Sequence, residues 1–230
     1  MEFLQSILNS DAQLFLYLNS IHNDFWDTIM LLVTRKETWV PLYLVIIYYF
    51  LKNYQSKSVL IFFMLALTIL TSDQVSVLIK ETVQRFRPVH EPAIENMVHN
   101  VLRKGGLYGF VSSHAANAFA ILVFTTKIFR NKSFWILMFF WALLFSYSRI
   151  YSGVHYPLDI IGGALLGWLV GWGFYKLLMF IETRFFLARN PKIEKTNLQP
   201  LQFATIFLVF AVLSITVVIV SYLLHHYNYL

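Results

Sequence analysis

The sequence predicts an all-α membrane protein: a polytopic bundle of about six transmembrane helices, with amphipathic surface helices at its N-terminal end. Hydrophobic residues make up 58% of the chain and aromatic residues 18%. Charged residues make up only 13%, about half of the usual share in a globular protein. A soluble fold of 230 residues could not bury so much apolar surface, so most of it must face lipid. In addition, apolar stretches of roughly 20 residues, long enough to cross a bilayer as a helix, recur along the chain.

Residues 1–34 differ from the rest of the chain. Apolar and polar residues alternate there with a helical period, and no stretch is long enough to span a bilayer. This pattern is typical of amphipathic helices that lie at a membrane surface. We therefore expect interfacial helices over residues 1–34 and a membrane-embedded domain over residues 35–230.

Six apolar stretches are the candidate spans. They cover residues 38–52, 58–79, 109–129, 134–150, 157–181 and 202–224. The first is short and could begin nearer to Arg35, whereas the last contains nothing that suggests chemistry. The fifth contains glycines at positions 162, 163, 167, 171 and 173. Small residues at this spacing let helices approach closely in lipid, so we interpret these glycines as packing positions.

The charges of the chain separate between the two ends of these spans. If the six spans are right, one face carries ten basic residues and only two acidic ones, Glu182 and Glu194. A positive face of this kind is expected to be cytoplasmic. Both termini and the connections 80–108 and 149–156 then lie outside. The net charge of +6 therefore does not indicate nucleic acid binding.

Three polar clusters lie at span ends on the predicted outer face, where charge is costly and indicates function. The segment KETVQRFRP closes the second span, GFVSSHAAN opens the third, and SRIYSGVHYPLD joins the fourth to the fifth. Their cations and histidines are Lys80, Arg85, Arg87, His114, Arg149 and His155. Cations that converge with two histidines form an anion site, for which phosphate is the natural ligand.

The spacing within the third cluster suits phosphoryl transfer. His155 and Asp159 are four residues apart, and Pro157 is placed to begin a helix between them. One helical turn would bring the carboxylate to the imidazole, fix its tautomer and stabilise the charge that develops as the other ring nitrogen attacks. His114 can then act as the general acid on the leaving oxygen.

No metal or cofactor is expected, because the candidate ligands lack the several carboxylates of magnesium or zinc phosphatases. The chain also has no cysteine, which excludes a thiolate metal site, a disulfide framework and a cysteine nucleophile.

The three clusters resemble the tripartite signature of the type 2 phosphatidic acid phosphatase (PAP2) superfamily, also called lipid phosphate phosphatases. Here the signature reads Lys80-x6-Arg87-Pro88, Ser112-Ser113-His114 and Ser148-Arg149-x5-His155-x3-Asp159. The resemblance implies a metal-independent phosphatase with a phosphohistidine intermediate at the outer leaflet. It assigns catalysis to His155, His114 and Asp159, and phosphate binding to Lys80, Arg87, Ser112, Ser113 and Arg149. The family's middle motif usually reads Pro-Ser-Gly-His, and here Val111 and Ser113 replace the proline and the glycine.

The resemblance and the small size of the chain favour undecaprenyl diphosphate as the substrate, hydrolysed on the periplasmic side of a bacterial inner membrane. No residue specifies the lipid tail. Phosphatidylglycerophosphate, phosphatidate and lipid A 1-phosphate therefore remain alternatives, as does a lipid phosphotransferase and, more remotely, a lipid transporter without enzyme activity. The expected partners are the lipid phosphate and membrane lipids, with no nucleic acid and no obligate protein partner.

Three further polar residues are singled out by position. Asp73 lies inside the second span, seven residues before Lys80 and so on the same helical face, and we expect it to pair helices or support the site. Arg85 is left open between a phosphate ligand and a headgroup anchor. His99 is expected to be a surface residue.

Overall fold

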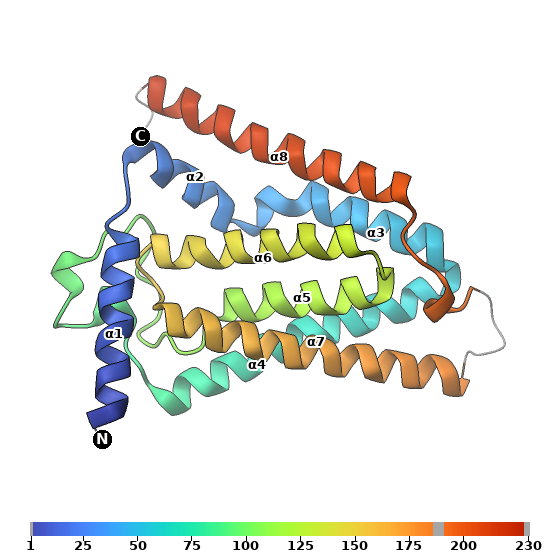
Figure 1. Ribbon diagram of the computed structural model, residues 1–230, viewed down its shortest axis with the longest axis horizontal. Helices are drawn as coiled ribbons and strands as arrows, with labels where there is room; N and C mark the ends of the chain where they lie inside the picture. The colour runs from blue at the N-terminus through green and yellow to red at the C-terminus, as the bar shows by residue number, and fades with distance from the viewer. Residues whose placement is uncertain (1, 186–190, 228–230) are drawn as a thin grey trace.

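The computed structural model describes residues 2–185 and 191–227, which form a helical bundle (Figure 1). Within these residues the only strand-like pairing is an isolated bridge between Phe86 and Tyr108. The long helices are α1 (Glu2–Asn19), α2 (Asp24–Thr34), α3 (Val40–Tyr54), α4 (Ser58–Val83), α5 (Ser113–Phe129), α6 (Lys132–Tyr151), α7 (Pro157–Phe185) and α8 (Pro200–His226). Helices α3 to α8 correspond in order to the six predicted spans.

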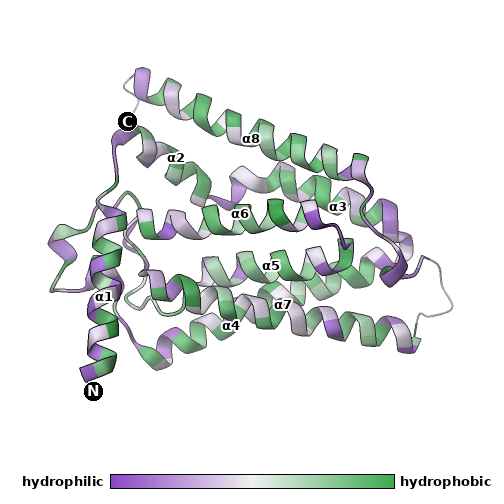
Figure 2. Ribbon diagram, in the orientation of Figure 1, coloured by the Kyte–Doolittle hydropathy of each residue, from purple (hydrophilic) through white to green (hydrophobic). Residues whose placement is uncertain are grey.

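The apolar helices are suited to a membrane, as predicted. Four helical stretches are long and apolar enough to cross one, namely Lys36–Val83, Lys132–Tyr151, Pro157–Phe185 and Pro200–His226. The first of these contains both α3 and α4, joined by a short 3₁₀ turn. Figure 2 shows hydrophobic residues along nearly all of α8, where large side chains such as Leu208 and Ile215 are exposed. Such a surface fits lipid rather than water.

Helix α5 is not among these four stretches, although it lies in the middle of the bundle. It has only 17 residues and contains polar side chains, including His114 and Asn117. Most of its residues are buried, because α4, α6 and α7 all pack against it. The structure therefore has a helix at each of the six predicted spans. Length and hydropathy alone recognise four candidate spans among the described residues, so the number six is approximate.

Four of the five glycines of α7 are packing positions, as predicted, whereas a Cβ atom at Gly173 would meet nothing within 4 Å. A Cβ atom at Gly163 would lie 2.5 Å from the carbonyl oxygen of Ser112, and one at Gly171 would lie 2.6 Å from that of Ala120. A Cβ atom at Gly167 would overlap the carbonyl group of Ala116. Backbones this close are a general feature of small-residue interfaces in membranes. They hold α5 against α7, and these two helices carry His114 and Asp159.

Replacing Gly167 by Ala should destabilise the protein by about 1–3 kcal/mol, because a methyl group against a backbone carbonyl forces the two helices apart. Gly173→Ala is the matched control, since a Cβ atom at Gly173 in the same helix meets nothing within 4 Å. Thermal unfolding in detergent would measure both variants. Equal melting temperatures for the two variants would contradict this account of the α5–α7 contact.

The N-terminal helices lie at the end of the bundle and along its side. Helix α1 crosses the end of the bundle at which α8 terminates (Figure 1). Helix α2 packs against α6 and α8 and buries Ile29, Met30 and Val33. Contact with a membrane surface over residues 1–34 stays a prediction.

The opposite end of the bundle contains the turns that join α3 to α4 and α5 to α6, together with the end of α7 and the start of α8 (Figure 1). Two of the charges counted there neutralise each other, since the Lys57 ammonium lies 2.6 Å from the Glu182 carboxylate and both are buried. Glu182 also accepts a hydrogen bond from the backbone N–H of Ile193, at 2.9 Å. The pair thus joins the start of α4, the end of α7 and the connection that follows it.

Candidate active site

The first turns of α5 and α7 are fixed to each other by Ser112. Its hydroxyl caps α5 by accepting a 3.5 Å hydrogen bond from the N–H of Ala115, and its own N–H donates to the carbonyl oxygen of Asp159 at 2.9 Å. The Ser112 side chain is fully buried. The next two residues on α5 are Ser113 and His114, and the His114 ring stacks on Phe145 with the ring centres 5.6 Å apart.

His155 and Asp159 form the pair that their spacing predicts. His155 Nδ1 lies 3.2 Å from Asp159 Oδ2, which also accepts a 3.0 Å hydrogen bond from the N–H of Tyr156. Pro157 begins α7 between them, as expected. His155 is 2% exposed and Asp159 is fully buried. A carboxylate at Nδ1 leaves Nε2 as the ring nitrogen available to a substrate.

Arg85 contacts Asp159 at Oδ1, the carboxylate oxygen that does not contact His155. Its guanidinium donates to Asp159 Oδ1 at 3.2 Å and to Asp11 Oδ2 at 2.7 Å, and its central carbon lies 3.9 Å from the centre of the Tyr156 ring. Asp11 Oδ1 accepts a further hydrogen bond, 3.0 Å long, from the N–H of Leu158. A chain of contacts therefore runs from α1 through Arg85 and Asp159 to His155. Neither interpretation of Arg85 from the sequence describes this arrangement.

Asp11 is a positioning residue that the sequence interpretation missed. It lies in the segment LNSDAQLFL of the predicted amphipathic helices and was not singled out there from the other polar residues. The structure leaves it 5% exposed, and burial raises the pKa of its carboxyl while the hydrogen bond from Arg85 opposes the shift. The residues three and four positions away from it in the helix are all apolar, namely Ile7, Leu8, Leu14 and Phe15. This helical face was the available signal, because an acid on an apolar face needs a partner when it is buried.

We predict that Asp11→Ala lowers kcat about 10-fold, the effect of losing one charge-assisted hydrogen bond on the group that orients His155. Asp11→Asn should lose less, because an amide oxygen still accepts from Arg85 or from Leu158. The KM for the lipid substrate should change little, since Asp11 does not line the site. Steady-state kinetics of the two variants would test this, and a large change in KM at constant kcat would contradict a positioning role.

The three predicted phosphate-binding cations lie near His155. The charges of Arg87, Arg149 and Lys80 all act on its imidazole. Burial lowers the pKa of His155 well below its ordinary value, and these three charges lower it further. His155 is therefore a neutral imidazole at neutral pH, and the neutral form is the one that can act as a nucleophile.

Each cation is held by a different element. Lys80 Nζ donates to Ser113 Oγ at 2.5 Å, Arg87 Nε donates to the carbonyl oxygen of Tyr108 at 3.1 Å, and Arg149 Nη1 donates to Thr34 Oγ1 at 2.7 Å. The buried Nε of Arg149 has no partner among the described residues. Ser113 stands where the family usually has glycine. It thus directly contacts Lys80, one of the residues predicted to bind the phosphate.

Two glycines in the connection between α4 and α5 allow the chain to approach these groups. A Cβ atom at Gly105, where φ is +70°, would lie 2.9 Å from the Arg87 guanidinium. One at Gly109 would lie 2.9 Å from Asp159 Oδ2. Neither glycine was singled out from the sequence.

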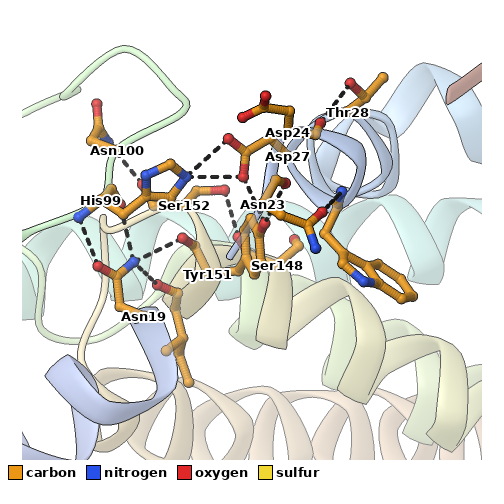
Figure 3. Close-up of polar contacts among 12 residues, drawn as sticks. Asn19, Asn23, Asp24, Asp27, Thr28, His99, Asn100, Ser148, Tyr151 and Ser152 are labelled. Carbon is orange, nitrogen blue, oxygen red and sulfur yellow. Dashed lines mark hydrogen bonds and ion pairs between the residues drawn. The ribbon is translucent and has the colours of Figure 1, made fainter. Parts of the chain in front are cut away.

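A polar network outside the site holds this connection against the end of α6 (Figure 3). Asn19, at the end of α1, donates to the carbonyl oxygens of Tyr151 at 2.8 Å and His99 at 3.0 Å, and it accepts from the N–H of His99 at 2.8 Å. Asp27 of α2 accepts from the Tyr151 hydroxyl at 2.6 Å and lies 2.9 Å from His99 Nε2. His99 is therefore a structural link rather than the surface residue expected. The network fixes the end of α6 two residues beyond Arg149.

His99, Asp27 and His22 also form the one set of three metal-ligating side chains that lie close together among the described residues. The His22 and His99 rings stack in parallel, 3.6 Å apart, so one ion cannot lie in both ring planes. None of the predicted phosphate-site residues belongs to this set.

A cavity of 680 Å³ extends from Ser113 and His114 into the bundle. Its lining is mixed. Polar and charged residues include Asp73 and Asn117 beside His114, and the segment 34–37, whereas apolar residues include Ile46, Phe50, Leu65, Ile121 and Trp141. Cavities of this size and character hold small organic ligands or parts of lipids.

The structure thus brings all eight predicted site residues to one end of the bundle. Three cations lie near a neutral histidine that a buried carboxylate orients, beside a cavity that is partly lined by apolar side chains. This combination defines a membrane phosphatase whose substrate has a phosphate and an apolar part. The PAP2 superfamily model matches residues 57–184, more than half of the chain, and the chain belongs to this superfamily.

Curated relatives agree with this assignment. The lipid A 4'-phosphatase of Bacteroides thetaiotaomicron is 42% identical over 76% of this chain and 78% of its own length. The lipid A 4'-phosphatase of Porphyromonas gingivalis is 35% identical over 82% of this chain and 81% of its own length. The undecaprenyl-diphosphatase BcrC of Bacillus subtilis is 28% identical over 68% and 77%, respectively.

A solved structure has the same fold. The transmembrane PAP2-type phosphatidylglycerolphosphate phosphatase from Bacillus subtilis superposes with a TM-score of 0.61 and is 19% identical, covering 80% of this chain and 90% of that one. This likeness confirms the predicted helical membrane architecture.

Proposed function

We propose that this protein removes the 4'-phosphate of a lipid A-type glycolipid, without a metal ion and through a phosphohistidine on His155. The observation that carries the chemistry is the neutral His155, held 3.2 Å from Asp159, with the charges of three cations acting on its imidazole. The choice of glycolipid rests on the relatives from Bacteroides thetaiotaomicron and Porphyromonas gingivalis, which match most of the chain.

In this mechanism the phosphate oxygens bind to Lys80, Arg87 and Arg149. The proton on His155 Nδ1 is held by Asp159, and Nε2 attacks phosphorus while the bond from phosphorus to the sugar oxygen breaks. His114 in its protonated form donates a proton to that oxygen as it leaves. The neutral His114 then takes a proton from the water that attacks phosphorus, the bond from phosphorus to Nε2 breaks, and inorganic phosphate and the neutral imidazole of His155 are released. The cations stabilise the charge on the phosphoryl oxygens in both transition states.

Undecaprenyl diphosphate, which the sequence favoured, is the second candidate. The Bacillus subtilis undecaprenyl-diphosphatase supports it, at lower identity than the two lipid A 4'-phosphatases. The same residues would act on a diphosphate, with a phosphoryl oxygen as the leaving group. The apolar part of the cavity would accept either an acyl chain or a prenyl chain.

We place the site on the periplasmic side of a bacterial inner membrane. The charge asymmetry predicted from the sequence supports this orientation, because the face predicted to lie away from His155 carries ten basic residues and only two acidic ones. Reaction of a single introduced cysteine with an impermeant reagent in intact cells would test it. Labelling of Arg103→Cys, but not of Lys132→Cys, is expected, and the reverse pattern would contradict the proposed orientation.

The function itself is tested by phosphate release from purified protein in detergent with a chelator present. Bis-phosphorylated lipid A, undecaprenyl diphosphate and phosphatidate would be compared, and mass spectrometry would locate the phosphate that is lost. We expect loss of the 4'-phosphate, and no release by His155→Ala. Release from undecaprenyl diphosphate alone would establish the second candidate. Activity that chelator abolishes would contradict the metal-free mechanism.

A further inference from the structure

We propose that Asp73 determines substrate specificity by accepting hydrogen bonds from hydroxyl or amide groups of the lipid headgroup, with Asn117 beside it. This inference deepens the proposed function and rests on it. The groups recognised are those of an acylated amino sugar, which donates hydrogen bonds close to its phosphate. A polyprenyl chain has no such donors.

Asp73 lies in the wall of the cavity that begins at His114. It is half-buried in α4, and Ser113, His114 and Asn117 line the same cavity from α5. Lys80 lies seven residues further along α4, which is roughly 10 Å along the helix axis. If the phosphate of the substrate binds at Lys80, the part of the substrate that reaches Asp73 is therefore the sugar ring that carries this phosphate, or the acyl linkages of that ring.

The Asp73 carboxylate has acceptor capacity that the protein does not fill. Its one side-chain partner among the described residues is the Asn117 amide nitrogen, at 3.5 Å, the limit of a hydrogen bond. An ionised carboxylate can accept about four hydrogen bonds. Asn117 Oδ1 is buried without a partner in the described chain. An acid inside a membrane span that faces a cavity, with so few partners, is suited to bind a ligand that brings donors.

A purely electrostatic role for Asp73 is the competing explanation. Its charge interacts with that of Lys80. Lys80, however, is already held by Ser113 Oγ at 2.5 Å and lies 3.4 Å from the carbonyl oxygen of Ser76. If Asp73 only positioned Lys80, its loss would affect every phosphorylated lipid alike. If it recognises donors, its loss would affect only substrates that have them. The two explanations therefore predict different ratios of kcat/KM between a substrate that has such donors and one that lacks them.

The test compares kcat/KM for lipid A with kcat/KM for phosphatidate, whose headgroup carries no sugar or amide. We expect Asp73→Ala to lower the value for lipid A about 10- to 100-fold, the effect of one or two hydrogen bonds to a charged group, and so to lower the ratio. Asp73→Asn keeps the size of the side chain and one acceptor oxygen, so its kcat/KM for lipid A should lie between the values of Asp73→Ala and the wild type. Gln74→Ala is the matched control, because Gln74 is the next residue on α4, is exposed and lies outside the cavity.

Each other outcome overturns a defined part of the account. Equal losses on both lipids would establish the electrostatic role and overturn recognition by Asp73, and unchanged kinetics on both would overturn it as well. If Asp73→Ala does not fold, the ratio measured with Asp73→Asn decides between the explanations. A wild-type enzyme that hydrolyses phosphatidate or undecaprenyl diphosphate but not lipid A would overturn the proposed function, and this inference with it.

Discussion

Replacing His155 by Ala is expected to lower the rate of phosphate release by at least about 10⁴-fold, because it removes the group that forms the covalent intermediate. No other described side chain combines this burial with a carboxylate at Nδ1 and three cations near it. The measurement is single-turnover release of phosphate from the best substrate, with folding checked by thermal unfolding in detergent.

His114→Ala is the informative comparison for His155→Ala. His114 also lies beside the site, but its proposed role is to protonate the leaving oxygen, which contributes typically 10²- to 10⁴-fold. Its loss should matter less for a substrate whose leaving group needs no proton, such as a nitrophenyl phosphate ester. Rescue by that substrate is expected for His114→Ala and not for His155→Ala. Rescue of both variants, or of neither, would contradict the division of roles.

Replacing Asp159 by Asn is expected to lower kcat by about 10²- to 10⁴-fold, the range seen when the carboxylate that orients a catalytic histidine is neutralised. An amide nitrogen at this position would donate to His155 Nδ1 and so place the ring proton on Nε2, the atom that must attack. The KM should change much less, since Asp159 is fully buried and does not reach the phosphate.

Arg85→Lys is the companion to Asp159→Asn. Lysine keeps a positive charge beside Asp159 but loses the planar fork that contacts Asp11 and Asp159 together. We expect a smaller loss of kcat from Arg85→Lys than from Asp159→Asn. A wild-type kcat for Asp159→Asn would show that the His155–Asp159 contact does not orient the nucleophile.

The parts of the site that are local in sequence were predictable from it. The interval of four residues between His155 and Asp159 fixes their contact as soon as Pro157 begins a helix, and the polar clusters at span ends are visible against apolar surroundings. Four of the five glycines of α7 could likewise be assigned to packing from their spacing, and the prediction was wrong for Gly173.

The parts that depend on long-range contacts were not predictable. Asp11 and Arg85 are separated by 74 residues, and so are Arg85 and Asp159, so no local pattern reveals that the three meet. Thr34 reaches Arg149 across 115 residues. The expected surface helices contribute these contacts because they pack across the end and along the side of the bundle. An amphipathic pattern shows which face of a helix is polar, but not what that face meets.

The most direct test of the central claim is to trap the intermediate. Protein incubated briefly with substrate labelled at the phosphate would be denatured in alkali, in which phosphohistidine survives, and the labelled peptide would be identified. The account predicts label on the peptide that contains His155, in the wild type and in His114→Ala, and none in His155→Ala. Label on a different residue, or undiminished label in His155→Ala, would contradict it.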